Sequence, residues 1–148
     1  MTQIYPYYPS EPQLLEVGLV KKSEKSRRYY DFFRDRVLFG IRNRDGQLVA
    51  YGGRRLKDSG SRPDKDEYLG PKYLNSPESA LFNKRTTLFG LYEAKEAIQN
   101  TQQALIVEGY MDVLGLASHG INNAVASMGT AITPEQLTLL ENCFRDGR

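Results

Sequence analysis

The sequence holds a single cysteine, Cys143, and a single histidine, His119, among its 148 residues. One cysteine excludes an internal disulfide and any zinc site built from cysteines. No apolar run approaches the ~20 residues of a membrane-spanning helix, and the N-terminal residues carry no signal-peptide pattern. The composition, 40% hydrophobic and 26% charged, is that of a folded soluble protein. We therefore expect a cytoplasmic protein of about one domain in length, with no membrane partner and no zinc.

The sequence also has almost no excess of either charge, because it contains 20 basic and 18 acidic residues. The two signs are nevertheless separated along the chain. Residues 21–85 hold seventeen basic and nine acidic side chains, a net charge of +8, whereas the remainder carries −6. A basic block beside an acidic one suits a protein that guides phosphates toward carboxylates. Solvated surfaces give the same pattern, so charge alone leaves both interpretations open.

The N-terminal part predicts a lead-in, a helix and a hairpin. Residues 1–10 are rich in tyrosine and proline and indicate a disordered lead-in, and a short helix is expected over residues 11–19. The β-rich runs 37–41 and 48–51 flank an Asp-Gly pair, which is typical of a β-hairpin. Gly52-Gly53 is expected to end the second strand.

The middle of the chain predicts little regular structure before one helix. Residues 57–71 are polar and rich in Gly and Pro, which favours an exposed loop, and residues 71–82 are expected to stay irregular. Apolar residues then recur at helical spacing, which predicts a helix over residues 87–99.

The last third alternates between strands and helices. The apolar run 104–107 predicts a strand covered on both faces, followed by a helix over residues 110–118 and a second strand over residues 124–127. Thr133-Pro134-Glu135-Gln136 forms a capping box that opens a helix over residues 133–142. This order predicts a βαβα unit with parallel strands and an α/β fold.

Glu108 is the most informative single position. It lies at the carboxyl end of a predicted strand, directly before Gly109 and a helix, where open parallel sheets collect ligands. A carboxylate at such a place is costly to bury without a metal, a cation or a proton. On spacing alone, a favourable charge at a helix N-terminus is the more common explanation for such a residue.

Several motifs together resemble one family. Residues 105–113 (Leu-Ile-Val-Glu-Gly-Tyr-Met-Asp-Val) resemble the first motif of the Toprim domain of bacterial DnaG-type primases. Residues 70–78 (Gly-Pro-Lys-Tyr-Leu-Asn-Ser-Pro-Glu) resemble a primase-specific signature, as does the stretch 31–37 that runs into 51–54. Residues 123–131 resemble the strand and loop after the Toprim helix. The resemblance runs in family order over residues 11–148.

The resemblance implies two parts. A basic α+β subdomain over residues 11–100 would hold template and nucleotide, and a partial Toprim domain over residues 101–148 would supply metal-binding acids. The family activity is template-directed synthesis of short RNA primers on single-stranded DNA, in which a 3′-hydroxyl attacks a ribonucleoside triphosphate and pyrophosphate leaves. The implied partners are the single-stranded template, ribonucleoside triphosphates and the replicative helicase, whose usual binding domain this sequence does not include.

The resemblance also implies roles for individual residues. Glu108 matches a metal ligand or proton acceptor, and Asp112, one helical turn later, supports it; these are the catalytic candidates, with Glu108 as the ligand of Mg²⁺ or Mn²⁺. The candidates for binding nucleic acid and nucleotide can pair with phosphates, form hydrogen bonds or stack. They are Arg34, Arg54, Lys72, Tyr73, Asn75 and Lys84.

The sequence departs from the family pattern in three ways. Phe32 stands where arginine is usual, which removes a phosphate contact, and Gly40 stands where proline is usual. A single cysteine leaves no zinc ribbon. Asp146-Gly147-Arg148 is not the Asp-Gly-Asp motif that follows the last helix in the family, which leaves the metal incompletely liganded. We therefore expect a truncated core with little or no primer synthesis of its own.

Two functions remain open on the sequence. The first is a primase catalytic-core fragment, and the second is a binding module for single-stranded nucleic acid without catalysis. A Toprim nuclease is disfavoured, because residues 71–77 resemble primases instead.

Overall fold

The computed structural model describes residues 9–56, 70–129 and 131–145. Most of the predicted lead-in and most of the predicted 57–71 loop lie outside these residues. Within the described part of the chain, no helix combines the length and the apolar character that crossing a membrane requires. One helix and five successive strands make up the first part, and helices and strands alternate after residue 90, which confirms the predicted α/β class with an α+β first part.

The chain begins with a short helix and a small hairpin. Helix α1 (Glu11–Glu16) is followed by β1 (Val20–Lys22) and β2 (Tyr29–Asp31), which pair antiparallel. The helix ends before Gly18, whose φ of +71° is a conformation that favours glycine. The predicted helix is confirmed in a shorter form, whereas the sequence did not predict β1 and β2.

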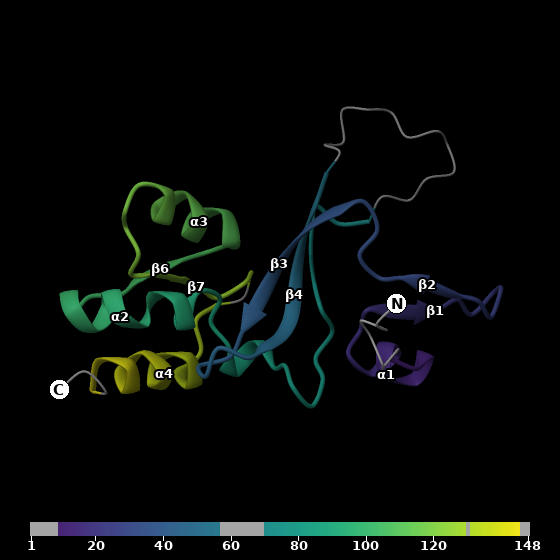
Figure 1. The fold of residues 1–148 in the computed structure, drawn as a ribbon, viewed down its shortest axis with the longest axis horizontal. Coiled ribbons are helices and arrows are strands. Elements are labelled where there is room, and N and C mark those ends of the chain that lie inside the picture. The colour runs from purple at the N-terminus through teal and green to yellow at the C-terminus, as the bar shows by residue number, and fades with distance from the viewer. Residues whose placement is uncertain (1–8, 57–69, 130, 146–148) are drawn as a thin grey trace, which may run out of the picture.

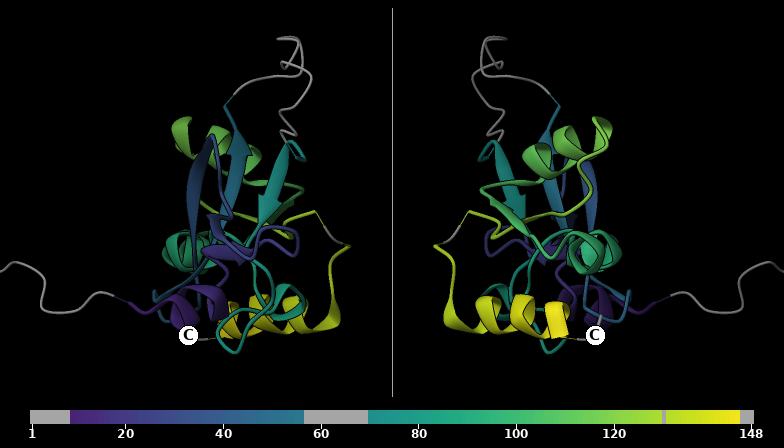
Figure 2. Two further views of the ribbon diagram at one scale, coloured as in Figure 1. Left: turned by 90° about the vertical axis from the view of Figure 1, so that its right-hand side faces the viewer. Right: turned by 90° about the vertical axis from the view of Figure 1, so that its left-hand side faces the viewer.

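A three-stranded antiparallel sheet forms the middle of the molecule. Strands β3 (Arg36–Arg42) and β4 (Leu48–Arg55) confirm the predicted hairpin, and β5 (Tyr73–Asn75) pairs with the far edge of β4. Two predictions are wrong here. Strand β4 continues through Gly52-Gly53, and β5 interrupts the stretch predicted as irregular. Figure 2 shows the three strands side by side.

The C-terminal part confirms the predicted βαβα unit. Strands β6 and β7 pair in parallel, helix α3 covers one face of this pair, and helices α2 and α4 cover the other (Figure 1). A 3-10 turn η1 precedes α2. The bounds are η1 (Lys84–Thr86), α2 (Leu91–Thr101), β6 (Leu105–Val107), α3 (Tyr110–Ser118), β7 (Ala124–Ala126) and α4 (Pro134–Arg145).

The start of α4 follows the predicted capping box. The Thr133 backbone N–H donates to Gln136 Oε1, and the Gln136 backbone N–H donates to Thr133 Oγ1, both at 3.1 Å. The Gln136 side chain is also buried and donates to the carbonyls of Lys84 and Thr87, at 2.8 Å each. The cap therefore also fastens α4 to the η1 turn.

Two expectations for the C-terminal part need correction. Helix α2 begins at Leu91 and not near Thr87, because Phe89 forms a bridge with Ala126 and Gly90 then turns the chain with a φ of +81°. Strand β6 is not covered on both faces, since Leu105 and Ile106 are 41% and 45% exposed. Among the described residues β6 pairs with β7 alone, so it lies at an edge of its sheet.

The two halves join through the ring of Tyr110. This side chain is 3% exposed and stacks on Phe39 of β3, with ring centroids 5.4 Å apart, while Phe89 meets it edge-on at 5.0 Å. On β4, a Cβ atom at Gly52 would lie 2.5 Å from Tyr110 Cζ. Glycine at this position therefore lets the first residue of α3 pack directly on the β4 backbone.

We predict that Gly52→Ala destabilises the protein by about 1–3 kcal/mol, because the added methyl overpacks the ring of Tyr110. Urea unfolding measures the change. Gly115→Ala is the matched control, since a Cβ there meets nothing within 4 Å. Replacing a glycine inside a helix should stabilise the protein by about 0.5–1 kcal/mol. Equal effects at the two glycines would contradict the packing described.

Candidate nucleic-acid interface

A cleft of about 570 Å³ lies where β5 meets the start of α3. Its walls come from β5, from residues 108–112 and from the loop after β7. The lining residues are Tyr73, Leu74, Asn75, Lys84, Glu108, Gly109, Tyr110, Met111, Asp112, Met128 and Gly129. The cleft thus brings together five of the eight residues that the sequence singled out, from both halves of the molecule.

The two carboxylates of the cleft differ in the bonds that they form with other residues. Asp112 Oδ2 accepts the backbone N–H of Gly109 at 3.1 Å, which satisfies a donor at the N-terminus of α3. Glu108 is exposed at the carboxyl end of β6 and has no hydrogen-bond or ion-pair partner among the described residues. Asp112 therefore holds the turn, while Glu108 is available to a ligand.

The opposite wall offers an aromatic ring and an amide. Tyr73 is 44% exposed, and its ring centroid lies 6.2 Å from that of Tyr110. Asn75 Nδ2 donates to the carbonyl of Met128 at 3.3 Å, whereas Asn75 Oδ1 is buried and accepts no hydrogen bond within the described residues. Met128 itself adopts a left-handed φ of +61°, which is uncommon for a side-chain-bearing residue. The Asn75 bond thus ties β5 to this strained turn.

Lys84 supplies a cation of the cleft from the η1 turn. Its backbone N–H donates to Glu78 Oε1 at 3.3 Å, and its carbonyl accepts from Gln136. The backbone is therefore held from two sides while the ammonium group forms no ion pair within the described residues. A lysine held in this way can bind a phosphate as a point charge.

The other three predicted binding residues do not line the cleft. Arg34 is exposed and stacks its guanidinium over the ring of Tyr30, 5.3 Å from the centroid. Arg54 pairs with Tyr73 across β4 and β5, and its Nε is buried without a hydrogen-bond partner in the described part of the chain. Lys72 is exposed just before β5, and strand alternation puts its side chain on the opposite face from Tyr73.

The residues that the structure describes do not make up a complete metal site. They contain no group of three or more His, Cys, Asp or Glu side chains able to hold an ion. Of the two carboxylates that line the described cleft, Glu108 is the one without a hydrogen bond or an ion pair to another described residue. Mg²⁺ often keeps several waters and takes one or two carboxylates together with substrate phosphates. Glu108 therefore fits as a single, shared ligand of a divalent cation and not as a complete site.

Tyr110 is a cleft residue that the sequence did not single out. Burial, and to a lesser extent the neighbouring Tyr73, raises the pKa of Tyr110 to about 12. The available signal was its place directly after Glu108-Gly109, but most of its partners come from β3, β4 and β5 in the other half of the molecule. Only the tertiary structure could therefore identify it.

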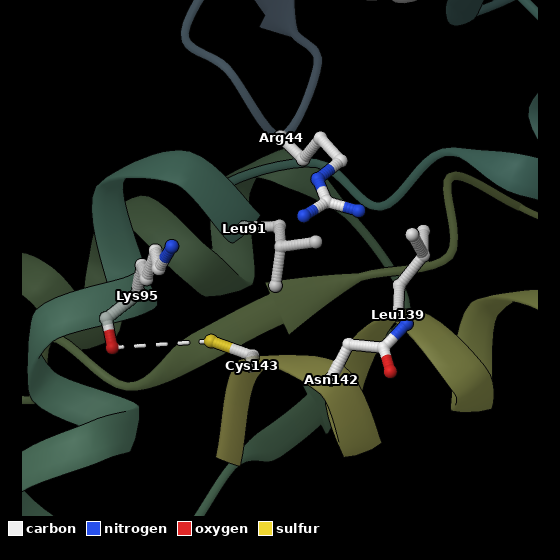
Figure 3. Close-up of a pocket in the computed structure, with 6 residues that line it drawn as sticks. All are labelled: Arg44, Leu91, Lys95, Leu139, Asn142 and Cys143. Carbon is white, nitrogen blue, oxygen red and sulfur yellow. Dashed lines mark hydrogen bonds between the residues drawn. The ribbon is translucent and has the colours of Figure 1, made fainter. Parts of the chain in front are cut away.

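A second, far smaller cavity lies away from the cleft, between α2 and α4 (Figure 3). Its volume is about 20 Å³, and Leu91, Leu139 and the buried Cys143 close it together with Arg44, Lys95 and Asn142. The Cys143 thiol points to the Lys95 carbonyl at 3.9 Å. Cys143 is therefore a packing residue between the two helices.

Known proteins resemble this chain along most of its length. Residues 6–95 match the family model of the DNA primase catalytic core, N-terminal domain, and residues 102–146 match the model of the Toprim domain. The DNA primase of Pasteurella multocida is 47% identical over 130 residues, which cover 88% of this chain and 20% of that protein. The chain thus spans about a fifth of the length of the curated relatives it matches.

Two solved structures extend the comparison to the fold. The RNA polymerase domain of Mycobacterium tuberculosis primase DnaG, in complex with a double-stranded DNA oligomer with a 6-nucleotide overhang, matches with a TM-score of 0.79 and 36% identity, covering 93% of this chain and 40% of that one. A DnaG primase catalytic domain bound to ssDNA matches with a TM-score of 0.75 and 42% identity. The match covers 89% of this chain and 39% of that one.

We predict that the raised pKa of Tyr110 makes stability fall at high pH. The unfolded chain releases this proton near pH 10 and the folded chain near pH 12, so the contribution is complete below pH 10 and is lost as the pH rises toward 12. Between pH 9 and pH 11 the wild type should lose about 1 kcal/mol more unfolding free energy than Tyr110→Phe. Denaturant unfolding at both pH values measures this, and identical losses would contradict the burial of the hydroxyl.

Proposed function

The chain belongs to the DnaG-type DNA primase family, whose catalytic-core model matches residues 6–95, and we propose that its cleft binds single-stranded DNA as part of a primase catalytic core. One observation carries this proposal. A single cleft combines an exposed tyrosine, an amide, a lysine and an unengaged carboxylate, namely Tyr73, Asn75, Lys84 and Glu108. Stacking rings beside cations are the chemistry that binds single strands without a sequence preference.

The proposed roles follow the position of each side chain. Tyr73 stacks on a base, Asn75 donates and accepts hydrogen bonds at the strand, and Lys84 pairs with a phosphate of the template or of a ribonucleoside triphosphate. Asp112 acts by holding the Gly109 backbone beside Glu108. The solved catalytic domain bound to ssDNA, at 42% identity, supports this use of the fold.

The remaining three cations extend the contact beyond the cleft. Arg54 shares the sheet face of Tyr73, and Arg34 and Lys72 lie on exposed backbone around the same sheet. Each can pair with a phosphate oxygen, and an arginine can do so through two parallel hydrogen bonds. We propose that these residues hold the strand where it leaves the cleft.

The proposed catalytic contribution of this chain is limited to Glu108. A divalent cation, Mg²⁺ or Mn²⁺, would stabilise charge on the phosphate oxygens during nucleotidyl transfer. Glu108 would supply one carboxylate ligand to that cation. Primer synthesis for replication, with ribonucleoside triphosphates and the replicative helicase as partners, is the proposed activity of the whole family core. That role on replicating DNA would put the chain in the cytoplasm.

The second candidate function is binding of single-stranded DNA without turnover by these 148 residues alone. The observation that favours it is the engagement of Asp112 with Gly109, which leaves Glu108 as the one unengaged carboxylate in the described cleft. Affinity for a hard divalent cation grows with the number of converging oxygen ligands. We therefore expect this chain to bind single-stranded DNA but to synthesise little or no primer.

We predict that Lys84→Gln weakens the binding of a labelled oligo-dT strand about three- to tenfold, because one phosphate contact is lost. The slope of log affinity against log salt should become shallower by about 0.7. Fluorescence anisotropy over a salt series measures both quantities. Arg145→Gln, at the far end of α4, removes the same charge outside the cleft and should leave affinity and slope close to those of the wild type.

The binding experiment tests the cleft itself, and a primer assay decides between the two candidates. No binding of single strands by the wild type, or equal losses in the two variants, would refute the proposed cleft. The same preparation, given template, ribonucleoside triphosphates and Mg²⁺, should yield no primers, because Glu108 alone is a weak site for the cation. RNA products of defined length would overturn binding without turnover and assign polymerase activity to the chain itself.

A further inference from the structure

Gln136, in the first turn of α4, is a polar side chain with 0% of its surface exposed. A buried amide costs free energy unless its oxygen and its hydrogens are bonded. Here Oε1 accepts the backbone N–H of Thr133 at 3.1 Å. Nε2 donates to the carbonyls of Lys84 and Thr87, at 2.8 Å each. The reverse orientation of the amide would set its oxygen against both carbonyls, so the network fixes which end faces the η1 turn.

The start of α4 does not by itself require an amide at residue 136. In a capping box, glutamate serves as well as glutamine, because only a side-chain oxygen is used. A carboxylate at this position would place an oxygen without a hydrogen against the carbonyls of Lys84 and Thr87. The amide of Gln136 is therefore explained by the turn that it reaches and not by the helix that it begins.

The first turn of α4 holds the η1 turn at three nearby carbonyls. Gln136 bonds two of them, and Thr133 Oγ1 donates to the carbonyl of Arg85 at 2.6 Å. The Arg85–Glu135 ion pair, at 3.5 Å, is exposed and adds little. A 3-10 turn of three residues forms few hydrogen bonds of its own. Its conformation therefore depends on these bonds from α4.

The η1 turn carries Lys84, whose side chain lines the cleft. Lysine has a long, flexible stem, so a phosphate that binds it pays for the lost side-chain freedom. A fixed backbone limits that cost, because it sets where the stem starts. The chain after β7 thus serves the cleft twice. Met128 and Gly129 line it directly, and Gln136 holds the backbone of Lys84 from outside.

We infer that Gln136 is a positioning residue for the phosphate contact of Lys84. It does not line the cleft and lies 52 positions from Lys84 along the chain, so it acts through the Lys84 carbonyl alone. This inference rests on the proposed function, which assigns the phosphate contact to Lys84. Without the amide donors of Gln136, the ammonium group stays charged but is no longer held where the phosphate lies.

A double-mutant cycle tests the inference, because it measures whether two residues act together. Gln136→Met keeps the length of the side chain and removes its donors and its acceptor. Affinity for a labelled oligo-dT strand is measured by fluorescence anisotropy at one salt concentration. Lys84→Gln should weaken binding about three- to tenfold in the wild type but less than about twofold in the Gln136→Met background. Gln136→Met alone should weaken binding about two- to fivefold.

The control separates positioning from a general loosening of α4. Leu139 lies on the same helix and packs between α2 and α4, away from the η1 turn. In a Leu139→Ala background, Lys84→Gln should keep its full three- to tenfold effect. Thermal unfolding establishes that each variant is folded at the temperature of the binding measurement. Gln136→Asn is the milder second variant, because its amide is set back by one methylene, and it should also reduce the effect of Lys84→Gln.

The outcomes distinguish this inference from the proposed function. A Lys84→Gln effect that is the same in the wild type, Gln136→Met and Gln136→Asn would overturn the positioning role and leave the cleft in place. An equal reduction in the Leu139→Ala background would overturn it as well, since any disturbance of α4 would then suffice. Failure of the wild type to bind the strand, or no effect of Lys84→Gln in the wild type, would refute the proposed function and this inference with it.

Discussion

The packing of Tyr110 against the bare backbone of Gly52 is the contact on which the candidate site depends. Tyr110 is the first residue of α3, so the position of its ring also sets the position of Glu108 and Gly109 immediately before it. The same ring touches β3 and faces Tyr73 on β5. One aromatic side chain thus joins the basic half to the acidic half and creates the cleft between them.

The contact of Tyr110 with the central sheet brings the basic half of the chain next to the acidic residues of the C-terminal half. The basic residues 21–85 build the hairpin, the sheet and the η1 turn, whereas Glu108 and Asp112 lie at the start of α3. In the function proposed above, phosphates attracted to the basic half would lie beside a carboxylate, which is the arrangement that nucleotidyl transfer needs. The described residues offer more candidates for binding than for catalysis. Most of the candidate contacts are cations or aromatic rings, and Glu108 is the one cleft carboxylate without a hydrogen bond or an ion pair among them.

Local signals predicted the elements well and their surroundings poorly. The Asp-Gly hairpin, the parallel βαβα order and the Thr133–Gln136 capping box depend on neighbouring residues, and all three are confirmed. Strand β5 was missed because its three residues are ordered by pairing with β4 and by Asn75 binding Met128. Glu108 was correctly placed at a strand end, but the opposite faces of Lys72 and Tyr73 follow only from the register of β5. The exposure of β6 likewise depends on which strands lie beside it.

The central claim is that single-stranded DNA lies in the cleft that Tyr110 creates. A ¹H–¹⁵N correlation spectrum of the chain, recorded during titration with oligo-dT, tests it residue by residue. The account predicts that the backbone amides of Tyr73, Asn75, Gly109 and Gly129 shift, while those of Leu139 and Cys143 between α2 and α4 stay in place. Shifts confined to the α2–α4 side, with the cleft amides unchanged, would contradict it.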